Sequence, residues 1–283
     1  MIRSLTAYPQ LIPLMKNQWK SPLEIKKVRE KKLKRLLIHA YENVPFYHEQ
    51  FKAAKADPYA FTSLEDLKRF PLISKEQLQA QPKGKILAQT VNPQNCRQFS
   101  TSGSTGAPLQ SYFTQQDSTL KNLAWIRVFL NSGMKPWYKA AAFIGQKDIK
   151  RQKSWYEYFG ILRRKEISTW SSPSSWIKEI RGWNPQALLG YVMTLILLAE
   201  EAGAASLANM GFKLLFHSSA LLDDTSRMKL EQAFGCRIVD IYGTDDAGCI
   251  AWECKTCRGY HISEDMLIVE ILKNGQPAAP GES

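Results

Sequence analysis

Residues 187–203 read ALLGYVMTLILLAEEAG, and this stretch decides the fold. A short apolar run, Ala187 to Tyr191, is followed by a longer helical pattern that ends at Gly203. Two further apolar runs follow, Lys213 to Ser218 and Arg237 to Tyr242, with a second helical pattern between them. Strands that alternate with helices are typical of a parallel sheet covered by helices, so the sequence predicts an α/β fold.

The same alternation extends upstream to about residue 95. Leu109 to Phe113 and Ala140 to Ile144 are further strand candidates. Thr114 can cap a helix, and Ser172 followed by Pro173 is typical of the start of another. Downstream, residues 261–271 alternate between apolar and polar side chains, and Asn274-Gly275 indicates a hairpin turn. We therefore expect a core that spans residues 81–283 and becomes more antiparallel beyond residue 258.

Residues 1–80 form a different, helical segment that we expect to pack on this core. Ser63 with Asp66, and Ser74 with Gln77, have the spacing of capping boxes. A basic helix precedes them, and its apolar side chains recur at helical spacing and predict one buried face: Leu33, Leu36, Leu37, Ala40 and Tyr41.

Composition excludes several classes of protein. The chain has 283 residues, 44% of them hydrophobic, and a formal charge of +12. It can bury a substantial core, so disorder is excluded. The longest apolar run, residues 187–199, is too short to cross a bilayer, and the N-terminus lacks the pattern of a signal peptide. We expect a globular cytoplasmic protein without a membrane span.

Positive charge gathers at the N-terminus. Residues 1–35 carry ten basic and two acidic side chains, and residues 147–165 carry seven and two. A basic helix can bind nucleic acid, but no nucleic-acid motif accompanies it. A solvated basic face is the interpretation that we favour, and we expect no nucleic-acid partner. The second basic stretch could neutralise an anionic ligand or form an ordinary loop.

The loop that follows Phe99 is the strongest chemical signal. Residues 100–108 read STSGSTGAP, so hydroxyl donors and glycines share one short segment. Such a segment can approach and bind phosphate closely. It is not a Walker A loop, because no Gly-Lys-Ser/Thr follows. An ordinary polar turn between two strands is the alternative reading.

Four soft metal ligands fall within 13 residues near the C-terminus. Cys249, Cys254, Cys257 and His261 have the spacing C-x4-C-x2-C-x3-H. Thiolate and imidazole ligands suit tetrahedral zinc, so we favour a structural Zn²⁺ site on Cys254, Cys257 and His261, with Cys249 as a weaker fourth ligand. A set of reduced thiols is the alternative. His217 ends a strand candidate, and we expect it to be a packed histidine.

These segments resemble a known superfamily. Residues 102–108 (SGSTGAP) and 240–246 (DIYGTDD) are similar to two motifs of the adenylate-forming enzymes, the acyl-CoA synthetases and adenylation domains. Residues 36–47 (LLIHAYENVPFY) and 259–271 (GYHISEDMLIVEI) resemble one branch of it, which contains phenylacetate-CoA ligase, coenzyme F390 synthetase and CapK-like proteins. The resemblance covers nearly the whole chain.

The resemblance implies a function and a site. Such enzymes activate a carboxylic acid with ATP to an acyl-adenylate, with Mg²⁺, and then transfer the acyl group, here to coenzyme A. The loop would hold the ATP phosphates, and Tyr242 would stack on adenine, with Gly243 allowing close approach. The implied nucleotide-binding residues are Ser102, Gly103, Ser104, Thr105, Gly106, Ser219, Ala220, Asp240, Tyr242, Gly243, Thr244 and Asp245.

Three departures from the family pattern carry consequences. Ala220 stands where many relatives have Glu. Asp246 is implied as the Mg²⁺ ligand, with Asp245 beside the α-phosphate; alternatively Thr244 and Asp245 fill these two roles with a slip of one residue. The family continues beyond a turn like residues 280–282 with a ribose-binding Asp and a small domain that carries a catalytic Lys. We therefore expect this chain alone to be the folded large domain, without appreciable turnover and with no certain catalytic residue.

Two interpretations of function remain open. The first is an acid-CoA ligase whose partners are a small carboxylate and a nucleotide. The second is a catalytically impaired nucleotide-binding or scaffold protein in capsular polysaccharide biosynthesis. The sequence leaves the carboxylate, the acceptor and a homodimer open.

Overall fold

The computed structural model describes residues 8–100, 110–146, 153–244, 246–256, 259–279 and 281. The chain divides into two compact units, one formed by residues 1–124 and 263–283 and the other by residues 125–262. This division differs from the boundary expected near residue 80, because the first hairpin and the start of a long helix group with the N-terminal helices. No helix in the described ranges combines the length and apolar character needed to span a bilayer.

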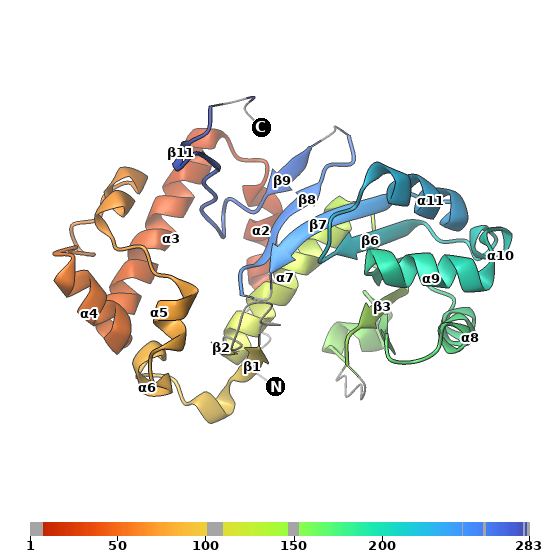
Figure 1. Cartoon of the computed structure of the whole chain (residues 1–283), viewed down its shortest axis with the longest axis horizontal. Helices are drawn as coiled ribbons and strands as arrows, with labels where there is room; N and C mark the ends of the chain where they lie inside the picture. Colours follow the sequence, from red (N-terminus) through yellow and green to blue (C-terminus); the bar gives the residue numbers. More distant parts are fainter. Residues whose placement is uncertain are drawn as a thin grey trace. The chain divides into compact units, whose positions relative to one another are not determined.

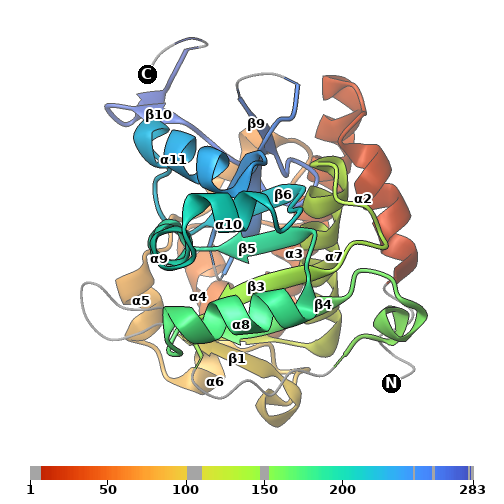
Figure 2. The ribbon, with the colours of Figure 1, turned by 90° about the vertical axis from the view of Figure 1, so that its right-hand side faces the viewer.

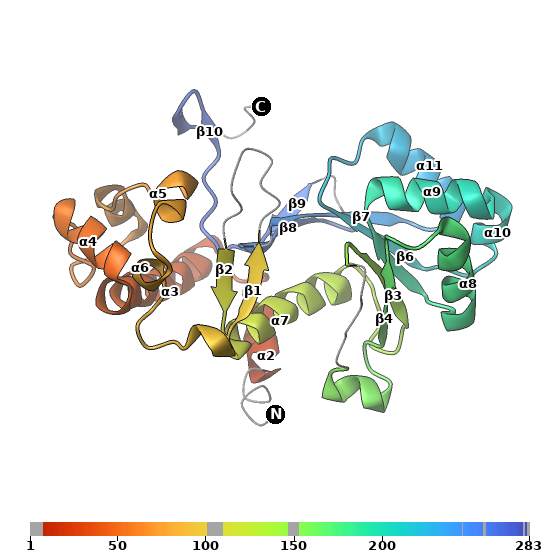
Figure 3. The same cartoon turned by 60° about the horizontal axis from the view of Figure 1, so that its bottom comes forward.

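The first unit is mainly helical, with two short hairpins. Its elements in chain order are η1 (Tyr8–Gln10), α2 (Leu11–Asn17), α3 (Pro22–Asn43), α4 (Pro45–Ala53), η2 (Leu64–Arg69), α5 (Lys75–Gln79), α6 (Lys83–Ile86), η3 (Pro93–Asn95), β1 (Arg97–Ser100), β2 (Gln110–Phe113), the start of α7 (Gln115–Asn131), β10 (Leu272–Lys273) and β11 (Gln276–Pro277). The strands β1 and β2 pair antiparallel and lie side by side in Figure 3.

The predicted capping boxes are confirmed. Ser63 with Asp66 begins η2, and Ser74 with Gln77 begins α5. The apolar face of α3 is confirmed except at one position. Leu37 packs with Phe51 and Phe61, and Leu33, Ala40 and Tyr41 join this cluster, whereas Leu36 is 62% exposed. The prediction for Leu36 is wrong because the buried stripe of α3 is narrower than five positions.

The polar face of α3 is partly occupied by the returning C-terminal segment. Lys32 Nζ donates to the Asp265 carbonyl at 2.7 Å, and Arg29 lies 3.5 Å from Glu264. The Asp265 carboxylate, which is buried, accepts a hydrogen bond from Asn17 Nδ2 at 3.0 Å. Two acidic residues of the segment 259–271 therefore attach it to α2 and α3, a structural role that the sequence analysis did not assign.

The second unit contains the predicted sheet, shown with its helices in Figures 1 and 2. Its strand order is β4-β3-β5-β6-β7-β8-β9, parallel from β4 to β7 and antiparallel from β7 to β9. The elements are β3 (Ala140–Ile144), η4 (Trp155–Phe159), β4 (Arg164–Ser168), α8 (Pro173–Trp183), β5 (Ala187–Gly190), α9 (Val192–Ala202), α10 (Ala204–Ala208), β6 (Leu214–Ser218), α11 (Asp224–Phe234), β7 (Ile238–Thr244), β8 (Gly248–Glu253) and β9 (Tyr260–Ile262). The α/β fold is confirmed.

Both faces of this sheet are buried. On one face, side chains of α8, α9 and α11 pack against Phe143, Leu188 and Leu215. On the other, Val128 and Phe129 of α7 pack against Phe216, Val239 and Trp252. The central strands are apolar on both sides for this reason. Two strands of this sheet, β4 and β8, were not predicted, so its antiparallel part begins ten residues earlier than expected, at Gly248.

Candidate functional site

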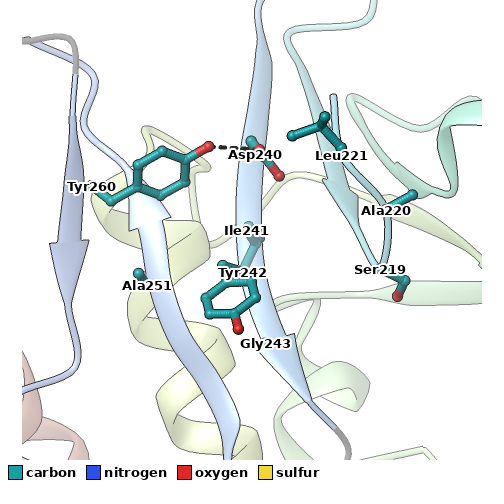
Figure 4. A pocket seen from close by; sticks show the side chains of 9 residues that line it. All are labelled: Ser219, Ala220, Leu221, Asp240, Ile241, Tyr242, Gly243, Ala251 and Tyr260. Carbon is teal, nitrogen blue, oxygen red and sulfur yellow. Dashed lines mark hydrogen bonds between the residues drawn. The ribbon is translucent and has the colours of Figure 1, made fainter. Parts of the chain in front are cut away.

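A pocket of about 520 Å³ lies beside the carboxyl end of β6 and along β7. Its volume is in the range of ~300–1,000 Å³ that is common for small-molecule sites. In parallel sheets, ligands bind at the carboxyl ends of the strands, and this pocket has that position. Figure 4 shows the lining residues, which come from the turn after β6 and from β7, β8 and β9: Ser219, Ala220, Leu221, Asp240, Ile241, Tyr242, Gly243, Ala251 and Tyr260.

The turn after β6 forms one wall of the pocket, and the buried side chain of His217 contacts its backbone. Ser219 has φ of +85°, a conformation that is strained for a residue with a side chain. His217 is fully buried, and its Nε2 lies 2.8 Å from the carbonyl oxygen of Ala220. Nδ1 lies 3.4 Å from the carbonyl oxygen of Gly190. The expectation of a packed histidine is confirmed, and the ring supports the turn rather than facing the pocket.

The strand β7 supplies the opposite wall. Ile241 is buried, so the next side chain, Tyr242, points outward and is 60% exposed. In Figure 4 the ring of Tyr242 projects between Tyr260 on one side and Ser219 on the other. The flat face of an exposed aromatic ring can stack on a planar base. The structure therefore brings together five residues that the resemblance assigned to one nucleotide site: Ser219, Ala220, Asp240, Tyr242 and Gly243.

Gly243 has a second explanation in the structure. The register of β7 and β8 shifts between Tyr242 and Gly243, and Gly243 pairs with Cys249. A Cβ atom at position 243 would lie 2.5 Å from the carbonyl oxygen of Gly248. Close approach of the two strands at the bulge thus requires glycine here, independently of any ligand.

Asp240 and Tyr260 join two strands across the rim of the pocket. The hydroxyl of Tyr260 donates to Asp240 Oδ2 at 2.6 Å. Burial, this hydrogen bond and the charge of Asp240 raise the pKa of Tyr260, so the phenol keeps its proton well into the alkaline range. Tyr260 was not among the predicted site residues, because β8, which aligns β9 with the pocket, was not predicted.

Three charged side chains, Glu253, Arg227 and Arg237, form a network next to the backbone of Asp240. Glu253 Oε2 accepts the Asp240 N–H at 3.3 Å and lies 3.2 Å from Arg227 and 3.8 Å from Arg237. The two arginines offset the charge of Glu253 close to the backbone of Asp240. These three charged residues fix the start of β7, and none was singled out in the sequence.

Much of the predicted phosphate and magnesium site lies outside the described residues. This applies to residues 101–109, hence to Ser102, Gly103, Ser104, Thr105 and Gly106, and to Asp245. The residues on either side of the loop, Ser100 and Gln110, pair in the β1–β2 hairpin. Thr244 Oγ1 accepts the Ala247 N–H at 3.0 Å, and Asp246 is exposed.

The predicted zinc ligands lie at different places along the β8–β9 hairpin: Cys249 within β8, Cys254 just after β8, and His261 within β9. Cys249 is buried in the core cluster with Val239 and Trp252. Cys254 Sγ lies 3.1 Å from Thr256 Oγ1 and accepts the Thr256 N–H at 3.4 Å, and the His261 ring packs on Trp252. Cys257 lies outside the described residues. Within the described ranges no group of three metal-binding side chains occurs, so Cys249, Cys254 and His261 do not form one.

The chain is similar to known proteins along most of its length. No protein-family model matches the chain. Among curated proteins, the chain is 28% identical over 272 residues to phenylacetate-coenzyme A ligase of Escherichia coli and 32% identical over 273 residues to that of Thermus thermophilus. Each match covers 92% of this chain, but only 61% and 60% of the relative. The chain thus spans about three fifths of the length of these relatives.

Solved structures extend the comparison to the fold. A crystal structure of 2-hydroxyisobutyryl-CoA ligase in complex with 2-HIB-AMP and CoA superposes with a TM-score of 0.78 at 20% identity, over 94% of this chain and 60% of that chain. An open conformation of the same ligase gives a TM-score of 0.76. This chain is therefore similar in sequence to the phenylacetate-CoA ligases over most of its length, and it shares the fold of 2-hydroxyisobutyryl-CoA ligase.

Proposed function

We propose that this chain forms the nucleotide-binding part of an acid-CoA ligase. The observation that carries the proposal is the pocket between the Ser219–Leu221 turn and Tyr242, in a chain similar in sequence to phenylacetate-CoA ligases. An adenine ring between the turn and the aromatic ring would bury both of its faces. Asp240 at the rim offers a carboxylate oxygen to the exocyclic amino group of adenine.

The proposed reaction has two steps. A carboxylate oxygen of the acid attacks the α-phosphorus of ATP, and the bond to pyrophosphate breaks, which gives an acyl-adenylate. The thiol of coenzyme A then attacks the acyl carbon, loses its proton and displaces AMP. The chain supplies binding and orientation rather than a covalent nucleophile. Because the named relatives act on phenylacetate, arylacetic acids are the first carboxylates to test.

A magnesium ion would neutralise the phosphate charge and polarise the α-phosphate when bound. Exposed Asp246 fits this role, because its carboxylate is a hard oxygen ligand that no element buries. The hydroxyl of Thr244 caps the following turn through the Ala247 N–H, so its lone pair is used locally while its proton can still be donated to a phosphate oxygen.

We also propose a structural zinc site on Cys254, Cys257 and His261. The support is local: the Cys254 N–H donates to the Gly259 carbonyl at 2.9 Å, so the residues at the two ends of the segment 254–259 lie close together. The Thr256 N–H donates to Cys254 Sγ. Hydrogen bonds of this kind stabilise a thiolate and orient it for a metal. Burial of Cys249 in the core leaves the fourth position to another ligand.

Binding of AMP to matched variants tests the nucleotide site. Tyr242→Ala removes the stacking surface, which contributes about 1–3 kcal/mol per base in other systems, so the Kd for AMP should rise about 5- to 150-fold. Tyr158→Ala is the control, because Tyr158 is also exposed, at 74%, and lies on η4 away from the lining residues. Equal Kd values for Tyr242→Ala and the parent chain would overturn the assignment of the site.

A further inference from the structure

The hydrogen bond between Tyr260 and Asp240 has a consequence for base selection. Oδ2 of Asp240 accepts the Tyr260 hydroxyl at 2.6 Å, and Oδ1 has no hydrogen-bond partner among the described residues. Both residues line the pocket beside Tyr242 (Figure 4). The carboxylate therefore has one oxygen fixed by the protein and one oxygen directed to whatever fills the pocket.

A carboxylate can only accept hydrogen bonds, so it discriminates between purines by the group at C6. Adenine carries an amino group there, which donates. Hypoxanthine carries a carbonyl oxygen, which would face the carboxylate without a shared proton. A site built around one polar group rejects the analogue that leaves this group unpaired. Asp240 can therefore make the pocket selective for adenine only if its carboxylate is held in place.

The structure shows what holds it. Asp240 is half-buried on β7, while Tyr260 extends from β9, two strands away, and β8 fixes the distance between them. Tyr260 is 50% exposed, so its ring contributes little to the core, whereas its hydroxyl contacts Asp240 directly. A tyrosine hydroxyl is protonated at neutral pH, so Tyr260 acts as the donor in this hydrogen bond.

We propose that Tyr260 is a positioning residue that fixes Asp240 Oδ1 toward the base and so sets the preference for adenine over hypoxanthine. This inference rests on the nucleotide site proposed above. It assigns no contact between Tyr260 and the reacting atoms. Tyr260 acts through Asp240, and loss of the hydroxyl lets the carboxylate rotate away from the base.

The test compares Kd values of AMP and IMP for the parent chain, Tyr260→Phe and Tyr59→Phe. Tyr59→Phe is a matched control: the Tyr59 hydroxyl also donates to a carboxylate, Glu42, at 2.6 Å, and Tyr59 is 51% exposed, but it lies in the helical unit. We expect the parent chain to bind AMP at least tenfold more tightly than IMP. Tyr260→Phe should weaken AMP binding about three- to tenfold and leave IMP binding unchanged, so that the ratio falls.

The outcomes separate the two proposals. If the parent chain binds AMP and Tyr260→Phe keeps the AMP/IMP ratio, the positioning role is overturned and the nucleotide site stands. If the parent chain binds neither nucleotide, both proposals fall. Equal weakening of AMP and IMP would indicate a merely structural role of Tyr260 and also overturns the inference. Because half of Tyr260 is exposed and phenylalanine keeps the ring, the variant should fold, which far-ultraviolet circular dichroism checks.

Discussion

The buried imidazole of His217 supports the carbonyl oxygen of Ala220, with Nε2 and the oxygen 2.8 Å apart. The residue between β6 and this carbonyl, Ser219, has a positive φ. The last residues of a core strand thus hold a strained turn in place, and this turn is one wall of the pocket. Stability of the core and shape of the site are coupled at this point.

Replacement of His217 tests that coupling. His217→Ala leaves a cavity in the core and removes the ring that supports the Ala220 carbonyl, so we expect a loss of about 2–4 kcal/mol in the free energy of unfolding. Urea denaturation followed by tryptophan fluorescence measures it. His39→Ala is the control, because His39 is exposed on α3, and it should change stability by less than about 0.5 kcal/mol. Similar values for the two variants would refute the supporting role of His217.

Gly243 offers a second test of the pocket wall. In Gly243→Ala the new methyl group would meet the Gly248 carbonyl at 2.5 Å, so the β7–β8 hairpin must shift at a cost of about 1–3 kcal/mol. Gly182→Ala is the matched control. Gly182 lies within α8 with nothing within 4 Å of the added atom, so alanine there should stabilise by about 0.5–1 kcal/mol. Thermal unfolding of both variants gives the comparison, and an unchanged melting temperature for Gly243→Ala would contradict the close approach.

Zinc content tests the cysteine turn. We expect about one zinc per chain in protein prepared without a metal-affinity tag, and a lower melting temperature after chelation, because metal binding contributes to folding. Cys254→Ser should lose the metal, whereas Cys96→Ser should retain it, since Cys96 lies in the other unit. Elemental analysis decides between the outcomes. If the purified chain contains no zinc and a chelator does not change its melting temperature, Cys254 and Cys257 are reduced thiols and the zinc site is refuted.

The Asp66 carboxylate, which caps η2, makes the free energy of unfolding depend on pH. Hydrogen bonds from the Thr62 N–H, the Thr62 hydroxyl and the Ser63 N–H lower the pKa of Asp66 to about 2. A carboxyl with a lowered pKa stabilises the fold above its unfolded pKa of about 4, and this contribution disappears as the pH falls toward 2. The stability difference between the parent chain and Asp66→Asn should therefore be constant near neutrality and shrink between pH 4 and pH 2. A difference that is equal at pH 7 and pH 2 would disprove it.

The fold was predictable where the signal was local. Ser172 with Pro173 begins α8, Thr114 and Asp117 cap α7, and Asn274-Gly275 turns the β10–β11 hairpin, each because a short-range hydrogen bond or backbone preference determines the structure. Strand β4 reads RKEIS and lacks an apolar run, so only its pairing with β3 makes it a strand. Tertiary pairing of this kind leaves no pattern in the sequence.

The residues of the candidate site also fall into those that local motifs predict and those that only the tertiary structure reveals. Tyr242, Ser219 and Ala220 were found by resemblance to motifs, and the structure places them around one pocket. Tyr260 was missed because its importance depends on a hydrogen bond to a residue 20 positions away on another strand. No spacing rule connects two such residues. The register of three antiparallel strands brings them together, and that register became visible only with β8 in place.

The charged side chains of β4 make this strand difficult to recognise in the sequence. They also oppose pairing of the sheet with a second chain. β4 is an outer strand of the described sheet, and one of its edges therefore carries backbone groups that β3 does not use. Arg164 pairs with Glu166, and Lys165 with Glu179, so charged side chains crowd this edge. Bringing a second chain alongside would require these charges to lose water, which opposes intermolecular strand pairing and aggregation. An apolar strand at this place would have been easier to recognise and more prone to form fibrils.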